Sequence, residues 1–149
     1  MTHLRSRSLT YNRNYFTALY TWGTGTDGQL GHSKFQLEGI LSESYVQTEP
    51  RRLIKSKGFT TVAIGGTYTL ALNETGHLFA WGDMFGKVKN NTPHALPTDK
   101  TFTHLSAGTK HAAAVDIDGQ VHTWGSSGDW FYGGGQLGHD NYEALTAPK

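Results

Sequence analysis

The sequence of 149 residues contains no cysteine. This absence excludes disulfide bonds, zinc sites with thiolate ligands and enzymes that attack with a cysteine thiolate. The sequence also has no run of roughly 20 apolar residues, the length that a membrane-spanning helix requires, and no apolar core of a secretory signal. The composition therefore gives no indication of a disulfide scaffold, a membrane span or a secreted chain.

Charge is scarce as well. Charged residues make up 17% of the chain and the formal net charge is only +1, so the overall charge does not indicate a class of partner. The acidic residues fall mostly in expected turns, and no Ser-His-Asp set or pair of carboxylates stands out for catalysis. We therefore predict a protein that is not an enzyme.

Motifs for a metal or a cofactor are each incomplete. His104, His111 and His122 lie close in the sequence, but no cysteine or acid stands beside them at ligand spacing. The segment "DIDG" (116–119) lacks the closing glutamate of a calcium loop, and "GDMFGK" (82–87) is one residue too short for a phosphate-binding loop. The sequence thus predicts neither a metal site nor a cofactor.

Basic residues gather first at the N-terminus. Residues 1–17, which we expect to form a basic N-terminal extension, carry Arg5, Arg7 and Arg13, and the first acid of the chain is Asp27. This composition is typical of a mitochondrial presequence and favours a mitochondrial location over a nuclear or cytoplasmic one. A plain basic tail is the alternative interpretation.

A second basic segment is "RRLIKSK" (51–57), which includes Arg51, Arg52 and Lys55. One interpretation is that the two basic segments contact RNA or an acidic protein surface. The other is an edge strand whose cations deter pairing with further strands. Both interpretations stay open at this point.

Glycine is abundant, at 19 residues, and it marks an internal repeat. The segment 59–82 aligns without a gap with 102–125, and both segments end in Trp-Gly. A partial third copy, "ALYTWG", spans residues 18–23. The element "GQLGH" follows two of the three Trp-Gly pairs, at 28–32 and again at 135–139.

Each copy has the pattern of strands joined by hairpins. Short stretches rich in β-branched and aromatic residues alternate with glycine turns such as "NETG" (73–76). In the strand that follows, we expect Leu78 and Ala80 on one face and Phe79 and Trp81 on the other. A small sheet of this kind cannot bury both faces alone, so neighbouring copies must stack, as in a propeller.

These segments resemble the regulator-of-chromosome-condensation (RCC-type) repeat family. The most specific is "LSAGTKHAAAV" (105–115), in which a histidine follows the glycine by three residues; "VAIGGTYTLAL" (62–72) has Tyr68 at that position. The segment "YTWGTGTDGQLGH" (20–32) resembles the family's Trp-Gly turn and the element after it. The resemblance covers residues 18–149.

The resemblance implies an all-β fold, and in the family this fold is a seven-bladed β-propeller. Seven units of this period need about 350 residues, whereas this chain holds about three, near 18–58, 59–101 and 102–149. We therefore expect an incomplete propeller: a fragment of a longer chain, a split propeller completed by another chain, or a remnant docked in a large assembly. The repeat residues to which the resemblance assigns a structural role are Trp22, Gly23, Gly65, Trp81, Gly82, Gly108, His111, Trp124 and Gly125.

For function, the resemblance implies a non-catalytic protein-interaction or scaffold module with other protein chains as its partners. We expect a subunit of a larger assembly, such as a mitochondrial ribosome or a respiratory complex. The alternative is a guanine-nucleotide exchange factor or chromatin-binding regulator for a small GTPase such as Ran, the role of the founding family member.

One aromatic group falls outside the repeat. The loop 126–134 lengthens the connection between the last Trp-Gly pair and the second "GQLGH", and it contains Trp130, Phe131 and Tyr132. The repeat does not require aromatic residues at these positions. We predict a protein contact there.

Overall fold

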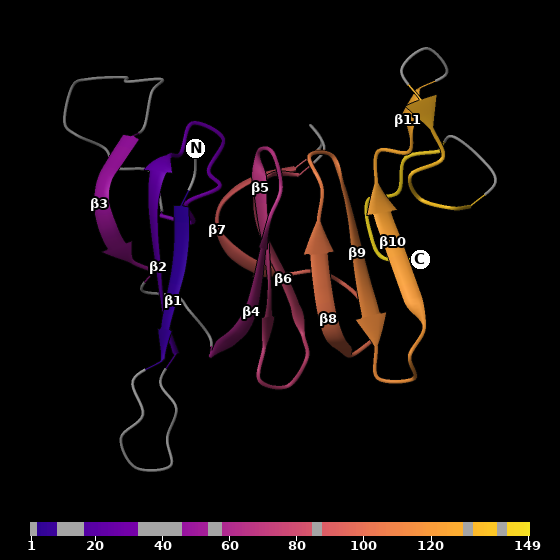
Figure 1. The fold of residues 1–149 in the computed structure, drawn as a ribbon, viewed down its shortest axis with the longest axis horizontal. Coiled ribbons are helices and arrows are strands. Elements are labelled where there is room, and N and C mark those ends of the chain that lie inside the picture. The colour runs from indigo at the N-terminus through magenta and orange to yellow at the C-terminus, as the bar shows by residue number, and fades with distance from the viewer. Residues whose placement is uncertain are drawn as a thin grey trace.

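The computed structural model describes residues 3–8, 17–32, 46–53, 58–84, 88–129, 133–139 and 143–149. The regular elements of these residues are β-strands, which form three antiparallel sheets side by side and one short two-stranded pair (Figure 1). In this part of the chain, no helix is long and apolar enough to cross a membrane. The all-β prediction is confirmed.

The first sheet consists of β1 (His3–Ser8), β2 (Thr17–Thr24) and β3 (Val46–Arg52), in that order. The central strand, β2, carries the first Trp-Gly pair. Strand β1 lies within the segment that the sequence assigned to the N-terminal extension, and it pairs with β2 along its whole length. This segment therefore contributes a strand to the first sheet.

The middle sheet consists of β4 (Phe59–Ile64), β5 (Tyr68–Asn73), β6 (Leu78–Met84) and β7 (Val88–Ala95), again in chain order. The hairpin between β5 and β6 is closed by Asn73, whose Oδ1 accepts hydrogen bonds from the backbone N–H groups of Thr75 and His77 at 3.2 and 2.8 Å. Such a cap satisfies turn donors that no strand can reach, and it confirms the turn predicted from "NETG".

The third sheet consists of β8 (Phe102–Ala107), β9 (His111–Asp116) and β10 (Val121–Gly125). It repeats β4–β6, down to a shift of register after the first residue of β8 that matches the shift in β4. An isolated bridge between Gly125 and Leu145 lies at the edge of β10 that does not pair with β9. Beyond β10, β11 (Gly128–Asp129) pairs with β12 (Gly133–Gly134).

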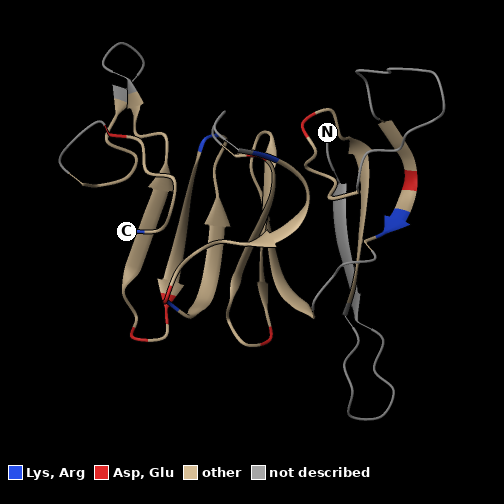
Figure 2. Cartoon of the chain, turned by 180° about the vertical axis from the view of Figure 1, so that it is seen from behind, with Lys and Arg blue, Asp and Glu red and all other residues tan. Residues whose placement is uncertain are grey.

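The hairpin of the third sheet is closed by Asp116. Its Oδ1 accepts hydrogen bonds from the backbone N–H groups of Asp118 and Gln120 at 3.0 and 2.8 Å, and its Oδ2 lies 2.8 Å from Nε2 of His122. These hydrogen bonds, led by the one to His122, hold the pKa of the Asp116 carboxyl below its ordinary value. Acidic residues at the hairpin ends are visible in red in Figure 2, which shows the chain from behind.

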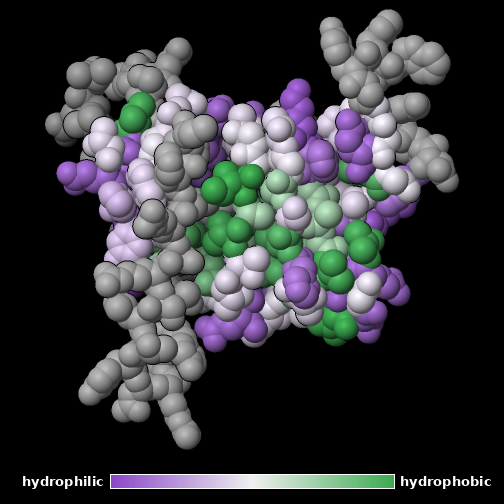
Figure 3. Space-filling model, viewed as in Figure 1, coloured by the Kyte–Doolittle hydropathy of each residue, from purple (hydrophilic) through white to green (hydrophobic). Residues whose placement is uncertain are grey.

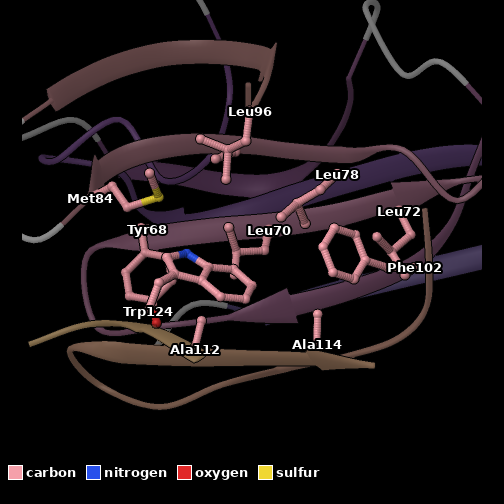
Figure 4. Packing of buried hydrophobic residues seen from close by; sticks show 11 residues of the cluster. Tyr68, Leu70, Leu72, Leu78, Met84, Leu96, Phe102, Ala112, Ala114 and Trp124 are labelled. Carbon is pink, nitrogen blue, oxygen red and sulfur yellow. The ribbon is translucent and has the colours of Figure 1, made fainter. Parts of the chain in front are cut away.

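The strands of the middle sheet send alternate side chains to opposite neighbours. Leu78 and Ala80 join a buried cluster with the third sheet, whereas Phe79 and Trp81 join another with the first sheet. Figure 4 shows the former cluster, in which the Trp124 ring packs over the middle sheet. The face assignment made from the sequence is therefore confirmed, and the core lies between the sheets.

Aromatic rings fill the interface between the first and middle sheets. The Phe59 ring stacks on Trp81 with centroids 5.7 Å apart and meets Phe79 edge-on at 5.3 Å. Leu19 of β2 and Leu53, which directly follows β3, are 3% and 2% exposed in the same cluster. Burying each such side chain contributes about 1.5–3 kcal/mol, so the two sheets form one continuous core.

Candidate interaction surface

The first "GQLGH" element folds into two successive turns after β2. Gly28 donates its backbone N–H to the Gly25 carbonyl at 3.0 Å, and Gly31 donates to the Gly28 carbonyl at 3.0 Å. Both Gly28 and Gly31 have positive φ values, of 82° and 75°. Side chains rarely adopt this conformation, so the two glycines allow the chain to turn back toward the sheets.

A buried threonine fixes this turn to its own sheet. The Thr21 hydroxyl donates to the Leu30 carbonyl at 2.7 Å, and its oxygen lies 2.9 Å from Nε2 of His32. Because the hydroxyl has only one proton, the His32 ring must donate the second hydrogen bond. Burial, followed by the charge of Arg51, lowers the pKa of His32, and a hydrogen bond with Thr21 opposes the shift. The ring is therefore neutral at pH 7.

The same turn is fastened to the middle sheet. The backbone carbonyl of Gln29 accepts a hydrogen bond from the indole N–H of Trp81 at 2.9 Å and one from the hydroxyl of Thr69 at 2.8 Å. All three residues are buried. A carbonyl oxygen has two lone pairs, so this contact, which we call the Gln29 clasp, satisfies a buried carbonyl and two buried donors together.

The second "GQLGH" turn has the same internal bonds. The Thr123 hydroxyl donates to the Leu137 carbonyl at 2.6 Å, and its oxygen lies 2.9 Å from Nε2 of His139. The surroundings of the two turns differ, however. A side chain added at Gly31 would lie 2.9 Å from Nε1 of Trp81, whereas one added at Gly138 would meet nothing within 4 Å. The second turn is thus formed, with Leu137 buried, but within the described part of the chain its glycine positions face open space.

The third sheet also has an uncovered face. Val121 pairs with Val115 in the same way that Leu78 pairs with Leu72 in the middle sheet. Leu78 is 1% exposed because the third sheet covers it, whereas Val121 is 67% exposed. We call this side of β9 and β10, with the turn 135–139, the open face.

A second apolar area lies along the innermost strands. In Figure 3, apolar side chains gather over the middle of the molecule, where β4 and β8 lie in Figure 1. Strands β4 and β8 carry the half-buried apolar residues Val62, Ile64 and Leu105. This area is therefore less exposed than Val121.

The repeat residues lie at equivalent positions of the three sheets. Trp81 and Trp124 are fully buried and Trp22 is half-buried, and the glycine after each tryptophan has a positive φ. At Gly82 an added side chain would collide with the Thr67 carbonyl. The remaining repeat positions also pack within the sheets: Gly65 lies against the Tyr68 ring and Gly108 against the His111 ring.

The predicted partner-binding residues are only partly brought together. Arg51 and Arg52 lie on β3, Arg51 half-buried and Arg52 exposed, and the backbone of Arg5 and Arg7 lies on β1. The other predicted contact residues lie outside the described residues: Arg13, Lys55, Trp130, Phe131 and Tyr132. Among the residues that the structure describes, no three His, Asp or Glu side chains are grouped closely enough to hold a metal ion.

Reasoning from the sequence missed the threonines that fix the turns. A signal for them was present. Thr21 and Thr123 each precede a Trp-Gly pair that is followed by "GQLGH", whereas the middle copy has Ala80 at that position and no "GQLGH". The hydroxyl and the turn occur together because the hydroxyl donates a hydrogen bond to a carbonyl of the turn and accepts one from its histidine.

Comparison with protein families identifies the repeat. The model of the regulator of chromosome condensation (RCC1) repeat matches residues 18–72, and a second model of the same repeat matches residues 102–129. Among curated proteins, the human E3 ubiquitin-protein ligase HERC2 is 31% identical over 144 residues. That match takes in 88% of this chain but only 3% of HERC2.

Solved structures show the same fold. The crystal structure of human WBSCR16 matches with a TM-score of 0.70 and 25% identity, over 89% of this chain and 34% of that chain. Prp20p from Saccharomyces cerevisiae matches with a TM-score of 0.71 and 23% identity, over 89% of this chain and 33% of that chain. The chain thus spans about a third of each. The repeat matches, the Trp-Gly turns and the stacked sheets together show that this chain belongs to the RCC1 repeat family and forms part of a β-propeller.

Proposed function

We propose that this chain is a non-catalytic protein-interaction module whose open face receives a further sheet of the same kind. The single observation that carries the proposal is the contrast between Val121, which is 67% exposed, and its counterpart Leu78, which is 1% exposed. In the middle sheet the same face is already an interface. The third sheet presents that interface again without its partner.

The uncovered turn supports the same kind of partner. In the first turn, the glycine positions are closed off by the next sheet, with Trp81 against Gly31 and Asn91 against Gly28. Gly135 and Gly138 have equivalent backbone conformations and open space around them. A partner sheet with a Trp-Gly strand fits this space, whether it lies further along a longer chain or on another chain.

Substitution on the open face tests the proposal. An apolar sheet face without its partner promotes self-association, and burial of one valine contributes about 1.5–3 kcal/mol. We expect Val121→Glu to weaken self-association of the chain in sedimentation by about tenfold or more. Val121 is exposed, so the variant should fold.

Ile117→Glu is the matched control. Ile117 is 66% exposed, but it lies in a hairpin turn, and its counterpart in the middle sheet, Glu74, is exposed as well. We expect this variant to associate as the unaltered chain does. The open face would be ruled out as the association surface if the unaltered chain stays monomeric and unfolds cooperatively, or if the two substitutions have equal effects on self-association.

The finer form of the proposal is a subunit of a larger assembly in mitochondria. The acid-free, arginine-bearing N-terminal residues support it, because that composition is typical of mitochondrial presequences. Fractionation of cells that express the tagged protein tests this location. Enrichment in the cytosol or the nucleus would contradict it without affecting the open face.

Nucleotide exchange on a small GTPase is the second candidate. It is supported by membership of the RCC1 repeat family and by the fold shared with Prp20p, a protein studied for its binding to Gsp1p and histones. Accelerated release of labelled GDP from a panel of small GTPases would establish this activity. Unchanged release rates would leave the interaction module as the function.

A further inference from the structure

The open face of the third sheet has the same elements as the face with which the first sheet contacts the middle sheet. Leu19 and Val121 hold equivalent positions in the two Trp-Gly strands, and Thr21 and Thr123 each fix a "GQLGH" turn. Leu19, which packs against the middle sheet, is 3% exposed, whereas Val121 is 67% exposed. The open face therefore fits the kind of surface that the middle sheet presents to the first sheet.

The first sheet carries a counterpart of that surface. Strands β1, β2 and β3 correspond to β5, β6 and β7, because in both sheets the Trp-Gly strand lies between two antiparallel partners and the register with the following strand shifts just before the glycine. Tyr20 is thus the counterpart of Phe79, which faces the first sheet. Since Leu19 is buried toward the middle sheet, the alternation of side chains along β2 puts Tyr20 on the opposite side, which we call the outer face.

One ion pair of the internal interface has neutral counterparts on both of these faces. Lys89 of β7 lies 3.6 Å from Asp27, which precedes the first "GQLGH". Val46 of β3 stands at the position of Lys89, because each pairs with the residue that follows its Trp-Gly pair. Gly134 precedes the second "GQLGH", at the position of Asp27. Contact between the open face and the outer face therefore leaves no member of this ion pair buried without its partner, which would be unfavourable.

The outer face is also more exposed than its counterpart in the middle sheet. Phe79 is 5% exposed where the first sheet packs on it, whereas Tyr20 is half-buried. The apolar side chain of Val46 is 56% exposed. Arg52 does not obstruct a packed sheet, because Ala95, its counterpart on β7, is exposed as well. The outer face thus has room for a sheet that carries a "GQLGH" turn.

We propose that the open face of one copy of this chain binds the outer face of a second copy. The inference rests on the proposed function and names the partner. The two faces belong to the first and third sheets, which lie at opposite ends of the row of sheets in Figure 1, so the contact is head-to-tail. Each dimer keeps one unused face of each kind, and further copies add until a ring closes. Two open faces do not match in this way, because each presents a turn and neither presents the aromatic side that a turn contacts.

Two substitutions, one on each side of the contact, test the proposal by complementation. Val121→Glu alters the open face and leaves the outer face intact, whereas Tyr20→Glu does the reverse. We expect each variant alone to sediment as a monomer at concentrations where the unaltered chain associates, because burying a carboxylate against an apolar sheet is unfavourable. An equimolar mixture should form a 1:1 dimer that grows no further, because it contains one intact pair of faces.

Val46→Glu is a second variant of the outer face that should leave the fold unchanged, because Val46 is exposed on an edge strand. We expect it to weaken association by about tenfold and to form the same dimer with Val121→Glu. Ile117→Glu is the matched control, since it places the same charge at an exposed apolar residue of a hairpin turn. It should associate as the unaltered chain does. Circular dichroism checks the fold of every variant.

The outcomes separate this inference from the proposed function. The inference is overturned, and the proposed function stands, if Val121→Glu is monomeric while both variants of the outer face associate as the unaltered chain does. Mixtures of folded variants that contain only monomers would overturn it as well. If Val121→Glu associates as the unaltered chain does, or if the unaltered chain is itself monomeric, the open face is not an association surface and the proposed function fails with the inference.

Discussion

The two interfaces between sheets both bury apolar side chains but use different polar contacts. Between the first and middle sheets, the Gln29 carbonyl accepts hydrogen bonds from Trp81 and Thr69. Between the middle and third sheets, the Tyr68 hydroxyl lies 3.0 Å from the Gly108 carbonyl and 2.6 Å from the His111 carbonyl. In one case a backbone carbonyl is shared by two side chains, and in the other a side chain is shared by two carbonyls.

This difference follows from the turn after each Trp-Gly strand. The middle sheet has no "GQLGH" element to meet Trp124, and the buried indole Nε1 of Trp124 has no hydrogen-bond partner among the residues that the structure describes. Apolar packing therefore suffices to position the tryptophan, and the clasp adds a polar contact where the turn provides one. The repeat preserves the strands and the packing, while the polar contacts vary.

The largest expected effect separates the covered turn from the uncovered one. Gly31→Ala should lower the free energy of unfolding by about 3 kcal/mol, because the strain of a positive φ adds to a clash with Trp81 and Leu53. Gly138→Ala has the same strain in open space and should cost about 1 kcal/mol. Urea denaturation of both variants measures the difference. Equal losses would show that the first turn is not held against the middle sheet.

A smaller effect distinguishes the two tryptophans. Trp81→Phe removes a donor of the Gln29 clasp as well as apolar contact, and we expect it to cost about 2 kcal/mol. Trp124→Phe removes a buried N–H without a partner, so the loss should be about 1 kcal/mol smaller. Thermal unfolding of the two variants in parallel tests this order. The reverse order would mean that the clasp contributes nothing.

The smallest effect concerns the polar contact of the other interface. Tyr68→Phe should cost about 1 kcal/mol at neutral pH. Burial raises the pKa of Tyr68 to about 12, above the ordinary value near 10. The stabilisation is therefore complete below pH 10 and declines as the pH rises through about 12. Urea midpoints of both proteins at increasing pH should converge over that range; a constant difference would contradict the assignment.

Much of the fold was predictable from the sequence because the residues that recur in the repeat are the ones that pack between the sheets. The gapless match of 59–82 with 102–125 located the strands of two sheets and their hairpins, and the alternation around Trp81 gave the correct faces. Strand β1 was not recognised. Its sequence, His3–Ser8, contains a single apolar residue, Leu4, so it has no alternation of apolar and polar residues to indicate a strand, and only its pairing with β2 defines it.

The candidate surfaces were less predictable, because each depends on what lies across a sheet. Val121 and Leu78 are both apolar residues at equivalent positions, and the sequence does not tell which one is covered. Arg5 and Arg52 are 47 positions apart in the chain, and only the register of the first sheet shows that both pair with Tyr20. The contact predicted at Trp130, Phe131 and Tyr132 lies outside the described residues and stays a prediction.

The Gln29 clasp also bears on how the chain is synthesised. Its two donors, Thr69 and Trp81, follow Gln29 by 40 and 52 residues. At a translation rate of about 5–20 residues per second, the carbonyl leaves the ribosome roughly 3–10 s before the indole that satisfies it. The clasp therefore forms only after the middle sheet has been synthesised, because both of its donors lie on strands of that sheet.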